Sequence, residues 1–261
     1  MSSIYQCQGC GLIYPNPMPI PSTINEHYGD ADKYFAEHSI DGKLAAYDGV
    51  IRTIEELGAK PGRLLDIGAG RGELLHAARS RGWEAVGLEP SPSFAAFARS
   101  YSGAEVVEGR IEERLFEERS FDVVTLGAVL EHVFNPVELL GEINRVLTDG
   151  GVFWLDVPNE AGLFFRLGNL YQRLRGRDWV VNLSPTFPPY HVFGYTPVAL
   201  RRLLDYAGFD TVKLETYATP AVFETSTSPV HAKLRPLLGL ALRVGERMGA
   251  GTYMDAWCYK R

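Results

Sequence analysis

Residues 64–75 read LLDIGAGRGELL, and this stretch decides the fold of the chain. A short apolar run passes into three glycines at alternate positions, and apolar residues at helical spacing follow. This order predicts a strand, a tight turn and a helix. Gly68, Gly70 and Gly72 let the turn approach a ligand closely because they lack a Cβ, and the first N–H groups of the helix point into the same crevice. A nucleotide-like ligand is therefore expected at the carboxyl end of the strand.

The spacing of the glycines indicates which class of nucleotide-like ligand the turn binds. A dinucleotide fingerprint reads G-x-G-x-x-G, but the position of its last glycine, counted from Gly68, holds Glu73. A P-loop needs Gly-Lys followed by Ser or Thr, which this turn lacks. The pattern Asp-x-Gly-x-Gly-x-Gly from Asp66 to Gly72 instead resembles motif I of the class I S-adenosylmethionine-dependent methyltransferases. In that family the acidic residue organises the loop, and the glycines leave room for the methionine part of the cofactor.

A second apolar run, WEAVGLEPS at residues 83–91, also reads as a strand followed by a turn. Glu89 ends the strand about 20 residues past the glycine turn, where an acidic side chain accepts hydrogen bonds from ribose hydroxyls. Pro90 suits the start of the helix that follows, which is expected over residues 93–100. Dinucleotide-binding folds share this carboxylate, so it predicts a ribose contact without distinguishing the two families.

Two further segments carry the resemblance. SFDVVTLGAVLEHV at residues 120–133 looks like the fourth-strand region of the methyltransferases, and LTDGG at residues 147–151 looks like their helix stop before the fifth strand. The resemblance runs from about residue 47 to residue 158 and returns at residues 191–197 and 207–209. It is closest to the small-molecule methyltransferases of ubiquinone biosynthesis. It implies an α/β fold with a doubly wound, seven-stranded, mainly parallel sheet and an antiparallel last hairpin.

S-adenosylmethionine is the expected cofactor, and its predicted contacts follow the carboxyl ends of the strands. They are Asp66, Gly68, Gly70, Gly72, Glu89, Pro90, Gly109, Arg110, Ile111, Gly127, Leu130 and Tyr34. Residues 109–111 should lie against the adenine, because backbone N–H groups and an apolar side chain suit a flat heterocycle. Gly127 and Leu130 should line the route to the methyl group. Related enzymes carry a tyrosine-bearing cap, so Tyr28 or Tyr34 is expected near the methionine end; ordinary packing in an N-terminal helix is the alternative.

The expected methyl transfer depends mainly on how the protein positions the nucleophile and the cofactor. A sulfonium carries its own electrophilic methyl group, so the protein must hold a nucleophile in line with that group and exclude water. A base is needed only if the nucleophile must lose a proton. His132 and His191 are the candidates, because an unperturbed imidazole titrates near neutral pH. His191 is the favoured base, and a structural hydrogen bond is the alternative role for either histidine. Oxygen is the favoured methyl acceptor, with carbon and nitrogen left open.

The chain divides into an N-terminal half-ribbon and cap, residues 1–40, and a methyltransferase domain, residues 41–261. A helical insertion at about residues 160–190 interrupts the family pattern after the fifth strand, where this fold usually builds a lid over the acceptor pocket. Its aromatic residues favour a planar or apolar small molecule, although packing on the core would also explain them. We expect residues 162–189, with Tyr190 and His191, to close over the methyl end of the cofactor.

The N-terminal segment carries a C-x-x-C-G knuckle at Cys7 and Cys10, followed by a strand-like run. It resembles the second half of the zinc ribbon that precedes some methyltransferases. A structural zinc site needs four ligands, and the sequence holds no second cysteine pair, since Cys258 lies alone at the other end. We therefore expect a half-ribbon without bound metal, or a truncated ribbon, and no metal site elsewhere; zinc shared between two chains is the alternative.

Composition agrees with one α/β core and argues against several functions. The 261 residues are 46% hydrophobic and carry a net charge of -6, which indicates no basic face for nucleic acid. No apolar stretch approaches the ~20 residues that span a bilayer, and three cysteines without a signal peptide indicate a cytoplasmic protein. The alternative functions are an inactive methyltransferase-like binding module and an NAD-dependent oxidoreductase. The sequence leaves the acceptor molecule and the oligomeric state open.

Overall fold

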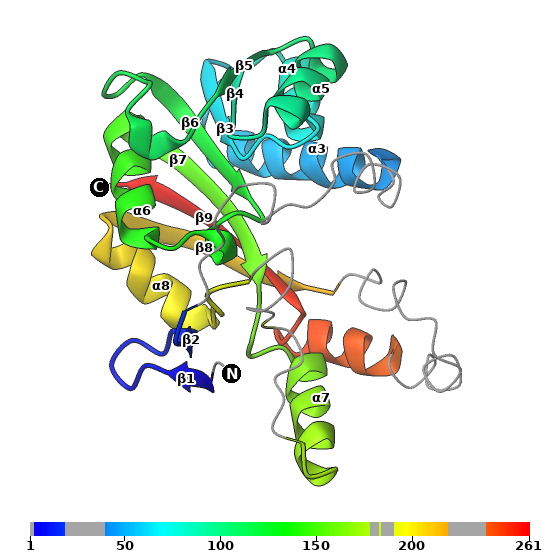
Figure 1. Cartoon of the computed structure of the whole chain (residues 1–261). Coiled ribbons are helices and arrows are strands. Elements are labelled where there is room, and N and C mark those ends of the chain that lie inside the picture. The colour runs from blue at the N-terminus through cyan, green and yellow to red at the C-terminus, as the bar shows by residue number, and fades with distance from the viewer. Residues whose placement is uncertain (1–2, 19–39, 178–182, 184–190, 219–238) are drawn as a thin grey trace.

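A seven-stranded sheet forms the body of the protein in the computed structural model, which describes residues 3–18, 40–177, 183, 191–218 and 239–261 (Figure 1). Its strands are, in spatial order, β5 (Glu105–Glu108), β4 (Glu84–Glu89), β3 (Arg63–Ile67), β6 (Phe121–Gly127), β7 (Leu147–Pro158), β9 (Tyr253–Lys260) and β8 (Phe209–Tyr217). The first five pair in parallel, and β9 lies antiparallel between β7 and β8. The expected topology, with its antiparallel last hairpin, is confirmed.

The order of the strands creates a switch point between β3 and β6. From β3 the chain moves outward to β4 and β5, and it then crosses back to continue with β6 and β7. Two neighbouring strands whose connections leave in opposite directions open a crevice at their carboxyl ends, which is where sheets of this kind bind ligands. Ile67 at the end of β3 pairs with Leu126 of β6, so the glycine turn begins at this crevice.

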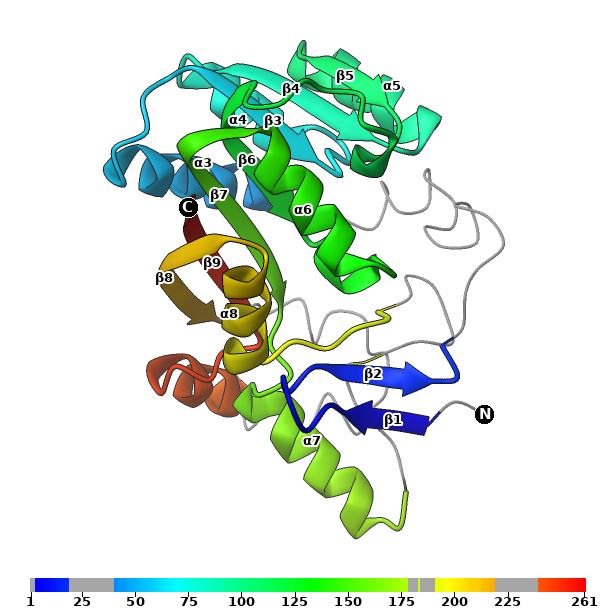
Figure 2. The same ribbon diagram turned by 90° about the vertical axis from the view of Figure 1, so that its left-hand side faces the viewer.

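Helices cover both faces of the sheet (Figures 1 and 2). The helices α3 (Ile40–Glu56), α4 (Glu73–Ser80) and α5 (Pro92–Ser102) lie on one face, and α6 (Pro136–Val146) and α8 (Pro197–Tyr206) lie on the other. Neighbouring residues of a strand point to opposite faces. Leu64 accordingly joins the core under α3, α4 and α5, while Leu65 joins the core under α6 and α8. The continuous apolar runs of the parallel strands reflect this burial on both sides.

Capping residues fix where the helices of the second face begin. Asn135 caps α6 by accepting a hydrogen bond from the Glu138 N–H (3.3 Å), and Thr196 caps α8 by accepting one from the Ala199 N–H (3.2 Å). A proline follows each cap. Its fixed φ suits the first turn of a helix, and its missing N–H would have had no partner inside the helix.

Two predicted boundaries differ from the structure. The helix expected over residues 93–100 is α5, which continues to Ser102 because the chain turns only at Gly103, where φ is 64°. The strand β7 begins at Leu147, directly after α6, and includes the Gly150–Gly151 pair that the sequence indicated as a helix stop. A register shift between β6 and β7 accompanies this early start.

The strands β1 (Ser3–Gln6) and β2 (Ile13–Asn16) form a separate antiparallel hairpin, with the predicted cysteine knuckle in its turn. Two backbone hydrogen bonds between Ile13 and Gly194, at 3.0 and 2.8 Å, join the hairpin to the body. The hairpin is thereby fastened to the segment that follows His191.

The insertion after β7 begins with helix α7 (Leu163–Leu174), which starts near the carboxyl end of β7 and runs away from the sheet (Figure 1). Apart from Leu183, the later part of the expected lid, residues 178–190, lies outside the described residues, as does the cap with Tyr28 and Tyr34. Residues 239–247 form a further helix. None of the helices in the described part of the chain is long and apolar enough to cross a membrane.

Candidate functional site

The glycine turn stands at the carboxyl end of β3 and leads into α4. Gly68, Gly70 and Gly72 have positive φ angles of 73°, 53° and 85°. A Cβ on Gly68 would lie 2.4 Å from a methyl carbon of Val129, and a Cβ on Gly72 would lie 3.1 Å from the Ala98 carbonyl oxygen. Among the described residues, a Cβ on Gly70 would meet only the Gly68 carbonyl oxygen, at 3.8 Å. The turn is therefore packed at both ends and open at Gly70, where a ligand can approach the backbone.

Glu89 at the end of β4 holds the turn in place. One carboxylate oxygen accepts a hydrogen bond from the Gly70 N–H (3.0 Å), and the other accepts one from the Ser91 N–H (2.9 Å). Glu89 is 5% exposed, and this burial raises its pKa. Each carboxylate oxygen has a second lone pair that can accept a hydroxyl from a ligand. The predicted ribose acceptor thus also shapes the turn, a role that the sequence did not reveal.

Asp66 ties the two strands of the switch point together. It lies buried on β3 and accepts a hydrogen bond from the Thr125 hydroxyl of β6 (2.8 Å). Burial raises the pKa of Asp66 to about 7, and the charges of Glu73 and Glu89 act in the same direction. Because β3 and β6 are joined at the base of the turn, this contact suits the loop-organising role that the resemblance implies.

The ends of β4 and β5 carry the next group of predicted cofactor contacts. The Gly109 N–H donates to the Glu89 carbonyl (3.3 Å), which places residue 109 directly beside the end of β4. Ile111 is buried in a one-turn helix, Arg110 before it is exposed, and Pro90 is half-buried. Together with the glycine turn and Glu89, these residues form what we call the cofactor edge, at the carboxyl ends of β3, β4 and β5.

Gly127 ends β6 beside a group of acidic and aromatic side chains. A Cβ on Gly127 would lie 3.4 Å from Asp156 Oδ1 and 3.6 Å from both the Trp154 ring and the Tyr47 hydroxyl oxygen. These are ordinary van der Waals distances, so Asp156, Trp154 and Tyr47 lie close around the end of the strand. Leu130, which was predicted beside Gly127, is fully buried in the core under α6 and α8.

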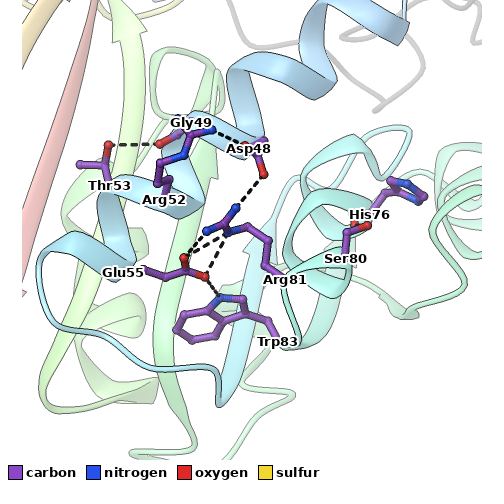
Figure 3. Close-up of polar contacts among 9 residues, drawn as sticks. All are labelled: Asp48, Gly49, Arg52, Thr53, Glu55, His76, Ser80, Arg81 and Trp83. Atoms are coloured by element: carbon purple, nitrogen blue, oxygen red, sulfur yellow. Dashed lines mark hydrogen bonds and ion pairs between the residues drawn. The ribbon is translucent and has the colours of Figure 1, made fainter.

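Helix α3, which carries Tyr47, is fastened to the cofactor side of the molecule by a charged network (Figure 3). The Arg81 guanidinium lies between Asp48 (3.1 Å) and Glu55 (2.5 Å), and the Trp83 indole N–H donates to Glu55 (3.2 Å). The Arg81 side chain is 29% exposed, so solvent screens these ion pairs and their contribution to stability is modest. Their main effect is geometric, because they fix the helix that brings Tyr47 to the end of β6.

A second polar group gathers just past β6, around the one-turn helix η2 (Leu130–His132). The rings of His132 and His191 contact each other, with 4.9 Å between centroids and 61° between planes. Glu131 joins them, with its Oε1 3.9 Å from His132 Nε2. One nitrogen or oxygen atom from each of the three side chains lies within 4.8 Å of the others. We call these three residues the His–Glu cluster; it unites two histidines that the sequence had predicted separately.

Glu131 is the member of the cluster that the sequence analysis missed. It is 2% exposed, and its Oε2 has no hydrogen-bond partner among the described residues. Burial, with the charge of Asp156 nearby, raises its pKa to about 8. Its backbone carbonyl accepts hydrogen bonds from the N–H groups of Val192 (2.8 Å) and Phe193 (3.2 Å), which hold the His191 segment against η2. A Glu-His pair was visible in the sequence, but the burial of its carboxylate was not.

Two aspartates face each other across β7 and β9 and border the same region. Asp156 pairs with Asp255 in the sheet. Asp156 Oδ1 accepts a hydrogen bond from the Ala128 N–H (2.8 Å), where φ is 52°, and the Tyr217 hydroxyl donates to Oδ2 (3.4 Å). Burial and the charge of Asp156 raise the pKa of Asp255 to about 8. The sequence singled out neither aspartate, because their proximity depends on the pairing of β7 with β9.

Comparison with known proteins gives the same fold and family. The chain matches the sequence model of the family described as "Methyltransferase domain" over residues 38–214, more than half of its length. Demethylmenaquinone methyltransferase from Chlorobaculum tepidum is 28% identical over 188 residues, which are 65% of this chain and 72% of that protein. Ubiquinone biosynthesis O-methyltransferase from Xanthomonas campestris is also 28% identical over 188 residues, 65% of this chain and 75% of that protein.

Among solved structures, a SAM-dependent methyltransferase from Archaeoglobus fulgidus superposes with a TM-score of 0.60 at 20% sequence identity. The match covers 87% of this chain and 99% of that chain. At this level of identity the likeness concerns the fold, since one fold serves many unrelated functions.

Proposed function

The chain belongs to the methyltransferase-domain family and is an S-adenosylmethionine-dependent enzyme, and on this premise we propose that it transfers the methyl group of this cofactor to a small-molecule acceptor in the cytoplasm. We propose a hydroxyl oxygen as the methylated atom, because the His–Glu cluster supplies imidazoles that can take its proton. Nitrogen and carbon acceptors are the alternatives. The family excludes the NAD-dependent oxidoreductase that the sequence left open.

The open glycine turn is the observation that carries this proposal. A ligand can approach the backbone at Gly70, where a Cβ would meet only one atom of the described residues within 4 Å, and the carboxylate of Glu89 lies directly beside it. We propose that Glu89 accepts the ribose hydroxyls, that Gly68, Gly70 and Gly72 border the methionine part, and that residues 109–111 border the adenine. When bound there, S-adenosylmethionine supplies an electrophilic methyl group on a sulfonium.

We place the acceptor between Gly127 and the His–Glu cluster. His191 contacts His132 in the structure, and its segment is held to η2 by the two hydrogen bonds to the Glu131 carbonyl. In our proposal an acceptor hydroxyl loses its proton to an imidazole nitrogen of His191. Glu131, whose pKa is about 8, favours the resulting imidazolium through its charge when its carboxyl is ionised. Tyr47 and Asp156, which lie beside Gly127, orient the rest of the acceptor in our proposal.

Ligand binding tests the cofactor half of the proposal. The melting temperature of the purified protein is measured with S-adenosylmethionine, S-adenosylhomocysteine and NAD. We expect both methionine-derived ligands to raise it and NAD to leave it unchanged, because a ligand that binds the folded state stabilises that state, and does so more the tighter it binds. Stabilisation by NAD alone would contradict the assigned cofactor.

Transfer of a radiolabelled methyl group tests the catalytic half. A panel of phenols and catechols is compared with matched anilines and with ring compounds that have neither group. We expect labelled product from the hydroxyl compounds. Cofactor binding with no transfer to any compound of the panel would favour the alternative, a binding module that keeps the fold and has lost the activity.

A further inference from the structure

The His–Glu cluster contains a buried carboxylate oxygen, Glu131 Oε2, whose surroundings suit a bound cation. Glu131 is 2% exposed, and its Oε2 has no hydrogen-bond partner within the described ranges. Buried polar groups in native proteins are nearly always satisfied, and an exception needs an explanation such as an ion. The two imidazoles beside Glu131 offer nitrogen ligands on the same side. A cation held by all three side chains would provide the missing partner.

The ligand types and their spacing suit a transition metal. Two histidines and one glutamate form the protein ligand set of several catalytic zinc sites, which keep a further position open for water or substrate. One candidate atom from each side chain lies within 4.8 Å of the others. Ligands at 2.0–2.2 Å from an ion lie about 3.4 Å apart in tetrahedral geometry, so binding requires the side chains to close by roughly 1 Å. Magnesium and calcium prefer an all-oxygen set and fit this cluster poorly.

The surroundings hold the cluster in a suitable arrangement. The Glu131 carbonyl accepts hydrogen bonds from the N–H groups of Val192 and Phe193, which keep His191 beside η2. The Tyr195 hydroxyl donates to the Leu130 carbonyl (3.4 Å), a second link between the same two segments. Such links orient the ligands of a metal site before the ion arrives. The charge of Asp156, which is near enough to affect Glu131, adds a negative potential that favours a cation.

We propose that Glu131, His132 and His191 bind one divalent transition-metal ion of the zinc class, with an open position for the acceptor hydroxyl. This inference rests on the proposed function and changes the role of the histidines from base to ligand. In the methyl transfer the O–H bond breaks and its proton passes to water. The oxygen forms a bond to the methyl carbon as the S–CH3 bond breaks, which gives the methyl ether and S-adenosylhomocysteine. The expectation of a metal-free protein did not consider this cluster, because its three side chains meet only in the folded chain.

Metal titration of the full-length protein tests the site without any acceptor. The protein is stripped with a chelator and titrated with Zn²⁺ by calorimetry, and with Co²⁺ while its visible absorption is recorded. We expect one ion per chain at this cluster. Glu131→Gln, His132→Gln and His191→Gln should each weaken the binding by about tenfold or more. Binding to the cluster should also change the Co²⁺ spectrum, and each of the three variants should remove that change.

Two controls separate this site from other metal-binding groups. His76→Gln alters an exposed histidine on α4, and the double change Cys7→Ser with Cys10→Ser removes the thiol pair of the hairpin. Neither should affect the binding at the cluster. Zn²⁺ binding that depends only on the cysteines, or that survives Glu131→Gln and His191→Gln, would overturn the inference. Absence of metal binding in a protein that still binds S-adenosylhomocysteine would also overturn it, while leaving the proposed function intact.

Discussion

Two glutamates are buried near the same edge of the sheet, and they differ in how the protein satisfies them. Glu89 is 5% exposed, and backbone N–H groups of Gly70 and Ser91 occupy one position on each of its oxygens. Glu131 is 2% exposed, yet its Oε2 finds no hydrogen-bond partner in the described part of the chain. A buried acceptor without a partner costs about 1–3 kcal/mol, and more when it is charged.

The difference separates a site that the protein completes by itself from one that needs a ligand. The cofactor edge has its shape before any ligand binds, because Glu89 fixes the turn and close packing fixes Gly68 and Gly72. The His–Glu cluster instead leaves an oxygen of Glu131 to be satisfied by a proton, a metal or an acceptor. Changes at the first site should therefore alter cofactor affinity, and changes at the second should alter turnover.

The largest effect is expected at the His–Glu cluster. His191→Ala removes the proposed proton acceptor or metal ligand, and turnover on a hydroxyl acceptor should fall by roughly 10²–10⁴-fold. The dissociation constant of S-adenosylhomocysteine, measured by calorimetry, should stay within about twofold of the parent value, because the cofactor edge is untouched. The matched variant His76→Ala, at an exposed position on α4, should retain full turnover. Normal turnover of His191→Ala would assign this histidine a structural role only.

The next largest effect is expected at the open glycine. Gly70→Leu places a side chain in the space where the ligand approaches the turn, and the affinity for S-adenosylmethionine should fall about 100-fold, or roughly 2.8 kcal/mol. The left-handed backbone at φ 53° adds about 1–2 kcal/mol of strain in the folded state. Gly141→Ala on α6, where no atom of the described residues lies within 4 Å of the added Cβ, is the control: it should leave the affinity unchanged and raise stability by up to about 1 kcal/mol, because alanine favours a helix over glycine. Unchanged affinity in Gly70→Leu would move the cofactor elsewhere.

A smaller loss of affinity is expected at Glu89. Glu89→Ala removes a charged hydrogen-bond acceptor worth about 1.5–3 kcal/mol, so cofactor binding should weaken by about 10- to 100-fold. Glu131→Gln is the matching change at the other glutamate and should leave cofactor affinity unaltered. Calorimetry on the two variants compares the two sites directly. Equal losses of affinity in both would show that the division into two functional halves is wrong.

The cofactor edge was predictable from the sequence because its chemistry is local. Three glycines and two acidic residues lie within two short strand-turn units, and the positive φ angles at Gly68, Gly70 and Gly72 require glycine at those places. The parallel order of β3 and β4 then brings Glu89 to the turn. What the sequence did not reveal is that Glu89 holds the turn itself, since its backbone contacts depend on the register of the two strands.

The His–Glu cluster and its acidic neighbours depend instead on contacts between distant parts of the chain. His132 and His191 could be named as candidates, but their contact arises from the hydrogen bonds between the Glu131 carbonyl and the segment after His191. Asp156 and Asp255 come together only through the antiparallel pairing of β7 with β9. No periodicity or motif encodes such pairings, so the acidic residues near Gly127 could not be predicted from the sequence.

Asp66 gives the smallest expected effect on cofactor affinity and turnover, because its ionisation changes the stability of the fold, and the pH dependence of unfolding measures that change. Its pKa is about 7 in the folded protein and near its ordinary value of 3.8 in the unfolded chain. Between about pH 4 and pH 7 the folded state therefore binds more protons than the unfolded state. Stability falls with rising pH wherever the folded state binds more protons, so the free energy of unfolding should decrease over this range. The slope due to Asp66 is at most about 1.4 kcal/mol per pH unit.

Asp66→Asn isolates this contribution. Asparagine keeps an oxygen that can accept the hydrogen bond from the Thr125 hydroxyl, and it does not ionise. The difference between the variant and the parent therefore reports the ionisation of Asp66, including its interaction with the charges of Glu73 and Glu89. Urea denaturation at a series of pH values should show the variant gaining stability relative to the parent as the pH rises from about 5 to 7, with a constant difference above that range. Parallel curves would mean that the carboxyl of Asp66 titrates at its ordinary pKa, and that its burial does not disfavour the charge.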